Sequence, residues 1–323
     1  MLFLPHSGFV QQANQPDPQK TRGPVIVTLG VTNNKMNSIK LIEKCHQKYL
    51  WDGRCEDCQN YDCQGDCNSC LDNIHMNRIK RRYNCKNITY FYVCKYLLKY
   101  MSEFYHLVEN SKALRNLDRY DIFSIGCGPC SDLFGIAKHL IKNRKATPIK
   151  YIGVDLNENW SDIHELIKKR TEKSKLNIDI RFHNKDITRV LKNTKGKKGT
   201  IPVNIITLHY VLSDMVANNL NITEFLEKLY KHIIKRLPSG SFVIINDINH
   251  YNTRDYFDIF LKLLQSKGKY KFKRYHYNNN NRTAYEYGEQ HPLNSLAVSI
   301  PDYLYDYNVW EFCSSSQMLI KKM

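Results

Sequence analysis

The sequence predicts an α/β fold in which a mostly parallel sheet is covered by helices on both faces. Short apolar runs alternate with amphipathic helical stretches from about residue 88 onward, which is the pattern of βαβ units. The chain has 323 residues, of which 42% are hydrophobic, so it can bury a sizeable core. A stretch dense in cysteine, residues 45–85, precedes this pattern and predicts a small additional module.

The elements of the α/β part follow from the spacing of apolar side chains. Helical spacing predicts a long helix over 88–108 and further helices over 133–142, 160–167, 222–237 and 256–263. Short apolar runs predict strands over 120–125, 149–154, 177–182, 203–208, 241–246, 270–277 and 314–322. Ligands bind such sheets beyond the carboxyl ends of the strands, so functional residues are expected there.

The chain divides into three expected parts. Residues 1–44 are a polar arm, 45–87 a cysteine-rich module and 88–323 the α/β domain. No apolar run reaches the roughly 18 residues that a membrane-spanning helix needs. The first residues also lack the basic flank of a secretory signal. A cytoplasmic or nuclear protein with reduced thiols is therefore expected.

The charge balance favours a polyanionic partner. The formal net charge is +17, and a balance that basic is most often associated with nucleic acid, here RNA rather than DNA. The stretch KGKYKFKRYHYNNNNR (267–282) mixes cations with aromatic rings, which suit phosphates and unpaired bases respectively. The alternative is that these residues form a solvated strand face.

The stretch YDIFSIGCGPCSDLFG (120–135) places two glycines between a strand and a helix. Gly126 and Gly128 lack a Cβ, so a ligand can approach the backbone, and the following helix offers free N–H groups. Asp155 ends the second strand, 27 positions after Gly128, where a carboxylate can accept both hydroxyls of a ribose. The dinucleotide fingerprint requires a third glycine where Ser131 stands, so that class of cofactor is not favoured.

Five motifs in succession resemble those of class I S-adenosylmethionine-dependent methyltransferases. They are FSIGCGPCSDLFG, YIGVDLNENW, FHNKDI, NIITLHYVLSDM and GSFVIINDI, and the resemblance covers about 118–323. It implies a Rossmann-like, seven-stranded sheet with a final antiparallel strand inserted beside the sixth. The family usually has an acidic residue where Ser124 stands and a glycine where Cys130 stands, so this chain departs from it at two positions.

The resemblance also implies roles for particular residues. The methionine portion of the cofactor would lie against Gly126 and Gly128, the ribose against Asp155, and the adenine against Asp186 and Ile187. The full set of cofactor-binding residues expected is Ser124, Gly126, Cys127, Gly128, Asp155, Leu156, Asp186, Ile187 and His209.

The end of the fourth strand, LHYVLSDM, is where the methyl acceptor is expected. His209, Tyr210 and Asp214 are the catalytic candidates, although His209 also fits a loop histidine and Asp214 a helix cap. The Asn/Asp-Pro-Pro-Tyr/Phe loop of enzymes that methylate amino groups of bases is absent, which disfavours that acceptor. A protein or small-molecule methyltransferase and a catalytically silent binding protein remain alternatives.

The cysteine-rich stretch predicts a structural metal. Two C-x-x-C pairs separated by eight residues can surround one tetrahedral zinc ion, with an iron–sulfur cluster as the alternative. The expected ligands are Cys45, Cys55, Cys58, Cys63, Cys67, Cys70, His75 and Cys85. A module this short buries little core, so the metal would stabilise its fold.

Overall fold

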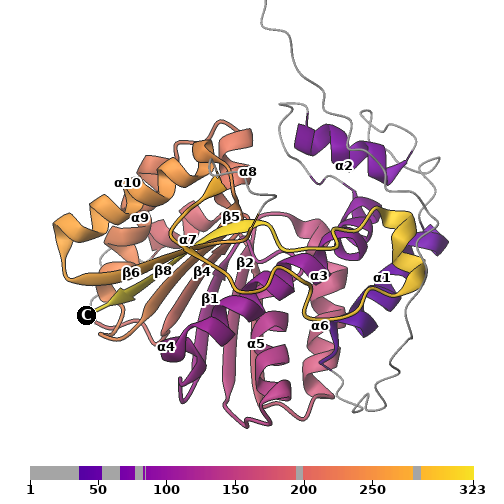
Figure 1. Cartoon of the computed structure of the whole chain (residues 1–323), viewed down its shortest axis with the longest axis horizontal. Coiled ribbons are helices and arrows are strands. Elements are labelled where there is room, and N and C mark those ends of the chain that lie inside the picture. The colour runs from indigo at the N-terminus through magenta and orange to yellow at the C-terminus, as the bar shows by residue number, and fades with distance from the viewer. Residues whose placement is uncertain (1–35, 53–65, 77–82, 84, 194–198, 279–284) are drawn as a thin grey trace, which may run out of the picture. The chain divides into compact units, whose positions relative to one another are not determined.

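The computed structural model describes residues 36–52, 66–76, 83, 85–193, 199–278 and 285–323 (Figure 1). In these residues an eight-stranded sheet has the order β3-β2-β1-β4-β5-β8-β6-β7. The strands are β1 Tyr120–Ile125, β2 Ile149–Asp155, β3 Ile178–Asn184, β4 Ile205–His209, β5 Phe242–Ile248, β6 Tyr270–His276, β7 Glu289–Gln290 and β8 Ser315–Lys322. None of the helices within this part of the chain is long and apolar enough to cross a membrane.

The sheet confirms the predicted fold class. Strands β1 to β5 run parallel, and β8 is antiparallel to both of its neighbours, β5 and β6. The inserted antiparallel strand is the feature that the family resemblance implied. The sheet differs from the expected seven strands by β7, a two-residue strand that pairs with β6 at the edge.

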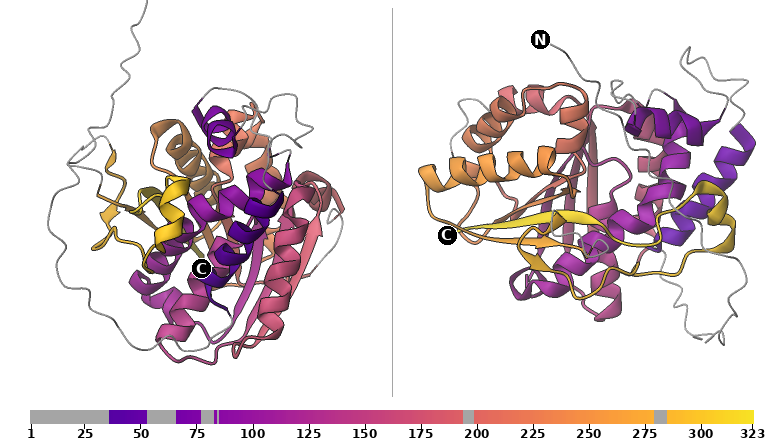
Figure 2. Two further views of the ribbon diagram at one scale, coloured as in Figure 1. Left: turned by 90° about the vertical axis from the view of Figure 1, so that its right-hand side faces the viewer. Right: turned by 45° about the horizontal axis from the view of Figure 1, so that its top comes forward.

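Helices cover both faces of the sheet (Figures 1 and 2). The helices on one side are α1 Ser38–Asp52, α2 Cys67–Met76, α3 Lys86–Asn110, α4 Lys112–Arg115, α5 Ser131–Lys142 and α6 Ser161–Glu172. Those on the other side are α7 Ile187–Asn193, α8 Leu212–Ala217, α9 Ile222–His232 and α10 Tyr251–Lys267. The two layers leave the carboxyl ends of the parallel strands free to form a site.

Two apolar cores result, one on each face of the sheet. Strand β1 contributes side chains to both cores, because successive side chains of a strand point to opposite faces of the sheet. Tyr120 and Ile122 join the core beneath α3 and α5, whereas Phe123 and Ile125 join the core beneath α8, α9 and α10. This burial on both faces explains why the central strands are near-continuous apolar runs in the sequence.

The described part of the cysteine-rich stretch does not have a core of its own. Cys45 on α1, and Cys67 and Leu71 on α2, are buried in the same apolar core as α3. Helix α1 also begins at Ser38, before the expected boundary at residue 45. Helix α3 presents apolar side chains to α1 and α2 as well as to α5.

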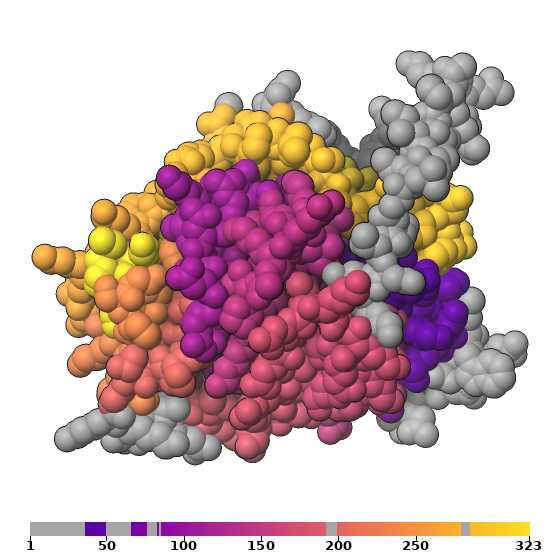
Figure 3. Space-filling view, turned by 90° about the horizontal axis from the view of Figure 1, so that it is seen from below, coloured from indigo at the N-terminus to yellow at the C-terminus, as the bar shows by residue number. Residues whose placement is uncertain are grey.

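The segment 291–313, between β7 and β8, packs along α3 (Figures 2 and 3). The carbonyl oxygen of Ser295 lies 2.8 Å from Nε2 of His106, and the Ala297 N–H donates to the Ser102 hydroxyl at 2.9 Å. The sequence contains no strong periodicity here and predicted no packing partner for the segment. Its position brings residues near the C-terminus to the carboxyl ends of β4 and β5.

Candidate active site

The turn between β1 and α5 adopts backbone conformations that glycine favours. Gly126 and Gly128 have φ values of +61° and +44°. A Cβ on Gly126 would lie 2.8 Å from Cγ2 of Val211, which is closer than real Cβ contacts allow. Cys130, at the N-terminus of α5, has a φ of +58° and therefore holds a left-handed conformation where the family usually has glycine.

This turn opens onto a cavity of about 750 Å³, a size typical of sites for nucleotide-sized ligands. The cavity lies beyond the carboxyl ends of β1, β2 and β4, as the fold predicts. The expected residues that line it are Gly126, Cys127, Gly128, Asp155, Leu156, Asp186, Ile187, His209, Tyr210 and Asp214. Of the expected cofactor residues, Ser124 is the one placed elsewhere among the described residues.

Asp155 links the ends of β1 and β2. Its Oδ2 accepts a hydrogen bond from the Gly128 N–H at 2.8 Å, and its Oδ1 accepts one from the Asn157 N–H at 2.9 Å. Burial raises the pKa of Asp155, although these two N–H groups and others oppose the shift. Each carboxylate oxygen has a second acceptor position, so two ribose hydroxyls can still bind on the cavity side.

Ser124 lies in the core beneath the turn, 1% exposed, and donates to Oδ2 of Asp132 at 2.7 Å. Asp132 also accepts hydrogen bonds from Thr207 at 2.6 Å and from Tyr151 at 2.8 Å. A buried carboxylate thus lies beside the position where the family has an acidic residue, but it comes from α5 instead of β1. The partners of Asp132 come from three separate strands, so no local pattern in the sequence indicated this contact.

His209 is held neutral at the edge of the cavity. Its Nδ1 lies 3.1 Å from the Ser131 hydroxyl, and its Nε2 is buried without a hydrogen-bond partner among the described residues. Burial lowers the pKa of His209 to about 4, so the imidazole is uncharged near neutral pH. An unpaired buried nitrogen is costly, and a ligand group in the cavity could satisfy it.

Tyr210 is fixed by a buried ion pair that the sequence analysis missed. Its hydroxyl donates to Oε2 of Glu103 at 2.8 Å and accepts from the Lys99 ammonium. Lys99 and Glu103, one turn apart on α3, are 2.7 Å from each other and almost fully buried. Burial alone would raise the pKa of Glu103, but the Lys99 charge and the hydrogen bonds that the carboxylate accepts together outweigh it, so the pKa is lowered.

The Tyr210 hydroxyl therefore does not have the lowered pKa that a catalytic base needs. Burial, followed by the Glu103 charge, raises its pKa well above the ordinary value, so it remains protonated. The residue has a φ of +60°, a strained conformation that is sustained by these contacts. The Tyr210 ring stacks on Tyr100, with centroids 3.8 Å apart, so we assign it to positioning instead of proton transfer.

A second cavity of about 470 Å³ adjoins the first and shares Tyr83, Tyr92, Tyr100, Tyr210 and Asp214 with it. Aromatic rings dominate its lining: Tyr83, Tyr92, Tyr96, Tyr100, Tyr210, Trp310 and Phe312. The Tyr96 and Tyr100 rings are parallel within 4° at a centroid distance of 5.4 Å. Because Trp310 and Phe312 belong to the segment 291–313, the sequence pattern did not associate them with the site.

The expected metal ligands near the N-terminus are only partly described. Cys45, Cys67, Cys70, His75 and Cys85 are described, and no three of them bring their ligand atoms together. The ring nitrogens of His75 contact the hydroxyls of Tyr96 and Tyr83, at 3.0 and 3.3 Å. Cys55, Cys58 and Cys63 lie outside the described residues, so zinc binding by this stretch stays a prediction.

Comparisons with known proteins give weak structural likenesses. No protein-family model matches the chain, and no curated protein matches its sequence. Similar solved structures include the plantazolicin methyltransferase BpumL in complex with SAH, at 14% identity and a TM-score of 0.42 over 88% of this chain and 100% of that one. A methyltransferase from Pyrococcus furiosus has 14% identity and a TM-score of 0.35, over 67% of this chain and 81% of that one.

A third example is phosphoethanolamine N-methyltransferase 1 of Haemonchus contortus, in complex with phosphoethanolamine and S-adenosylhomocysteine. It has 12% identity and a TM-score of 0.38, over 89% of this chain and 50% of that one. All three TM-scores are below 0.5, so the fold assignment rests on the strand order of this chain.

Proposed function

We propose that the chain is an S-adenosylmethionine-dependent methyltransferase. The observation that carries the proposal is the open cavity at the first βα turn, lined by Gly126, Gly128 and Asp155. The residues fit the cofactor because Gly126 and Gly128 line the cavity without side chains, and because Asp155 keeps acceptor capacity toward the cavity. The strand order, with β8 antiparallel between β5 and β6, supports the same class.

Each residue has a role that follows from its position. The cofactor, when bound, supplies a methyl group activated by a sulfonium, so the protein mainly has to align it and exclude water. Asp155 would hold the ribose, and the main chain at Gly126 and Gly128 would allow the methionine portion close approach. The buried Nε2 of His209 would gain a hydrogen-bond partner from the ligand.

The second cavity is our proposed acceptor site. It shares five residues with the first cavity, so an acceptor bound there would lie beside the methyl donor. Asp214 is the acidic residue in its described lining. We propose that its carboxylate takes up the proton that a neutral acceptor loses when it is methylated. The aromatic rings provide flat apolar surfaces and keep water out of the site.

We propose nucleic acid, and RNA in particular, as the acceptor. The net charge of +17 supports a polyanion, and seven aromatic rings in the acceptor cavity suit the stacking of an unpaired base. A protein or small-molecule acceptor is the alternative, and the same aromatic lining would suit an apolar or planar group from either.

Three measurements test these proposals. Calorimetry with S-adenosylhomocysteine should show binding by the folded protein, and no binding at millimolar concentration would remove the enzyme proposal. Incubation with labelled cofactor and separate pools of RNA, DNA and protein should transfer label to RNA. Affinity for RNA should fall steeply as salt rises, whereas label in protein with no salt-sensitive RNA binding would favour the alternative acceptor.

A further inference from the structure

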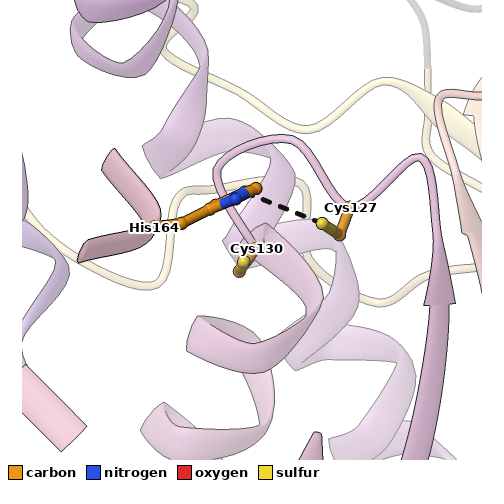
Figure 4. A group of neighbouring side chains, drawn as sticks. All are labelled: Cys127, Cys130 and His164. Carbon is orange, nitrogen blue, oxygen red and sulfur yellow. Dashed lines mark hydrogen bonds between the residues drawn. The ribbon is translucent and has the colours of Figure 1, made fainter. Parts of the chain in front are cut away.

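Two thiols and an imidazole meet directly behind the glycine turn (Figure 4). Cys127 and Cys130 lie at either end of the turn Cys-Gly-Pro-Cys, and His164 reaches it from α6. One ligand atom from each of the three side chains lies within 4.8 Å of the other two. The distance from Nε2 of His164 to Sγ of Cys127 is 3.7 Å.

The fold fixes all three side chains in this arrangement. The left-handed conformation of Cys130, with a φ of +58°, brings the second thiol back toward the first. The His164 ring stacks on Phe182 with centroids 4.0 Å apart and planes 7° apart, and its Nε2 contacts the Gly128 carbonyl oxygen at 2.8 Å. Cys127, Cys130 and His164 are 5%, 0% and 9% exposed, so bulk water competes little for a ligand here.

We propose that Cys127, Cys130 and His164 form a zinc-binding site that fastens the glycine turn to α6. Tetrahedral zinc, with bonds of about 2.3 Å to sulfur and about 2.0 Å to nitrogen, places ligand atoms about 3.5–3.8 Å apart. The observed 3.7 Å separation already matches, and the remaining separations require contractions of at most about 1.3 Å from the 4.8 Å limit. Cys127 also lines the cofactor cavity, so water from that side can supply a fourth ligand.

Charge and proton balance also suit the site. On binding, each thiol loses its proton to solvent, and the His164 proton on Nε2 moves to Nδ1, so the imidazole stays neutral and the bond to zinc replaces the hydrogen bond to the Gly128 carbonyl oxygen. Two thiolates then balance the two positive charges of the ion, which a buried site requires.

Zinc binding would bear on the cofactor cavity without depending on the methyltransferase proposal. The turn that the ion would hold carries the Gly128 N–H, which donates to Asp155. A fixed turn would therefore keep Asp155 and the glycines in position before a ligand arrives. This site is also distinct from the zinc predicted for the cysteine-rich stretch, which has other ligands.

The test is the zinc content of the full chain, reduced, saturated with zinc and then desalted. Cys130→Ser and His164→Asn should each contain one zinc ion fewer per chain than the wild type. Cys313→Ser, which removes an equally buried thiol outside the site, should lose none. Because the cysteine-rich stretch can bind zinc in all four proteins, only the difference from wild type reports on this site.

Cobalt substitution gives a second, independent readout. The thiolate–cobalt charge-transfer absorption should be weaker in Cys130→Ser and Cys127→Ser than in the wild type, and unchanged in Cys313→Ser. Circular dichroism verifies that each variant is folded. Equal zinc content in the folded His164→Asn, Cys130→Ser and wild-type proteins would overturn the proposal. A disulfide between Cys127 and Cys130 that persists under reducing conditions would overturn the proposal too. It would be detected by the mass of the intact chain, and the variants would then lose no zinc relative to the wild type.

Discussion

Replacement of Gly126 by alanine tests how the cofactor turn depends on a missing side chain. With a φ of +61°, alanine at this position would have to hold a left-handed backbone conformation, at a cost of about 1–2 kcal/mol. The Cβ would also lie 2.8 Å from Cγ2 of Val211, and relief of such an overlap costs about 1–3 kcal/mol. Together these give about 2–5 kcal/mol, shared between the stability of the fold and the affinity for cofactor.

Gly240→Ala is the matched control. Gly240 has a φ of +87°, but a Cβ there meets nothing within 4 Å, so only the backbone cost applies. Urea unfolding should show both variants destabilised. Calorimetry with S-adenosylhomocysteine should show weaker binding, by about tenfold or more, in Gly126→Ala alone, since about 1.4 kcal/mol corresponds to a tenfold change.

A double variant separates the overlap from the backbone strain. Val211→Ala removes the atom that the new Cβ meets, so Gly126→Ala should be less harmful in that background. The reasoning is refuted if Gly126→Ala binds S-adenosylhomocysteine as tightly as Gly240→Ala, or if Val211→Ala provides no relief.

Two further predictions concern buried ionisable groups. Lys99→Met should destabilise the fold by about 3–5 kcal/mol, because it leaves the Glu103 charge buried and unpaired. Lys228→Met, which breaks an exposed pair with Glu224 on α9, should cost at most about 1 kcal/mol. Urea unfolding compares the two variants, and equal losses of stability would contradict the account. The lowered pKa of His209 means that the unfolded chain takes up its proton first as pH falls, so stability should decline from about pH 6.5 to about pH 4. His209→Gln should reduce that decline in thermal melts at several pH values, and an unchanged decline would show that His209 is not held neutral.

The sequence predicted the frame of the fold because central strands are continuous apolar runs. Strand β1 has the predicted bounds, Tyr120–Ile125, and the other main strands differ by one or two residues at one or both ends. The helix predicted over 222–237 ends at His232, since residues 234–236 form a 3₁₀ helix. Helix α1 was missed because it begins within the polar arm, where composition gave no sign of packing against α3.

The candidate site was predicted where local conformation determines it. The glycine turn and Asp155 follow from short-range pattern, and both line the cavity. Lys99 and Glu103 lie in a helix predicted only from its apolar spacing, and their importance depends on Tyr210, which is more than 100 residues away. Trp310 lies in the second cavity because the segment 291–313, which has no apolar periodicity, packs along α3. Contacts of this kind, between distant parts of the chain, could not be predicted from the sequence pattern.

The claim at the centre of the account is that Asp155 holds the ribose of a nucleoside cofactor. Calorimetry can test it by titrating S-adenosylhomocysteine and its 2′,3′-dideoxyribose analogue into the wild type and into Asp155→Ala. Loss of two hydrogen bonds to a charged group should weaken wild-type binding of the analogue by about 3 kcal/mol, roughly 100-fold, and the two ligands should bind Asp155→Ala about equally. An undiminished preference for the hydroxylated ligand in folded Asp155→Ala would contradict the account.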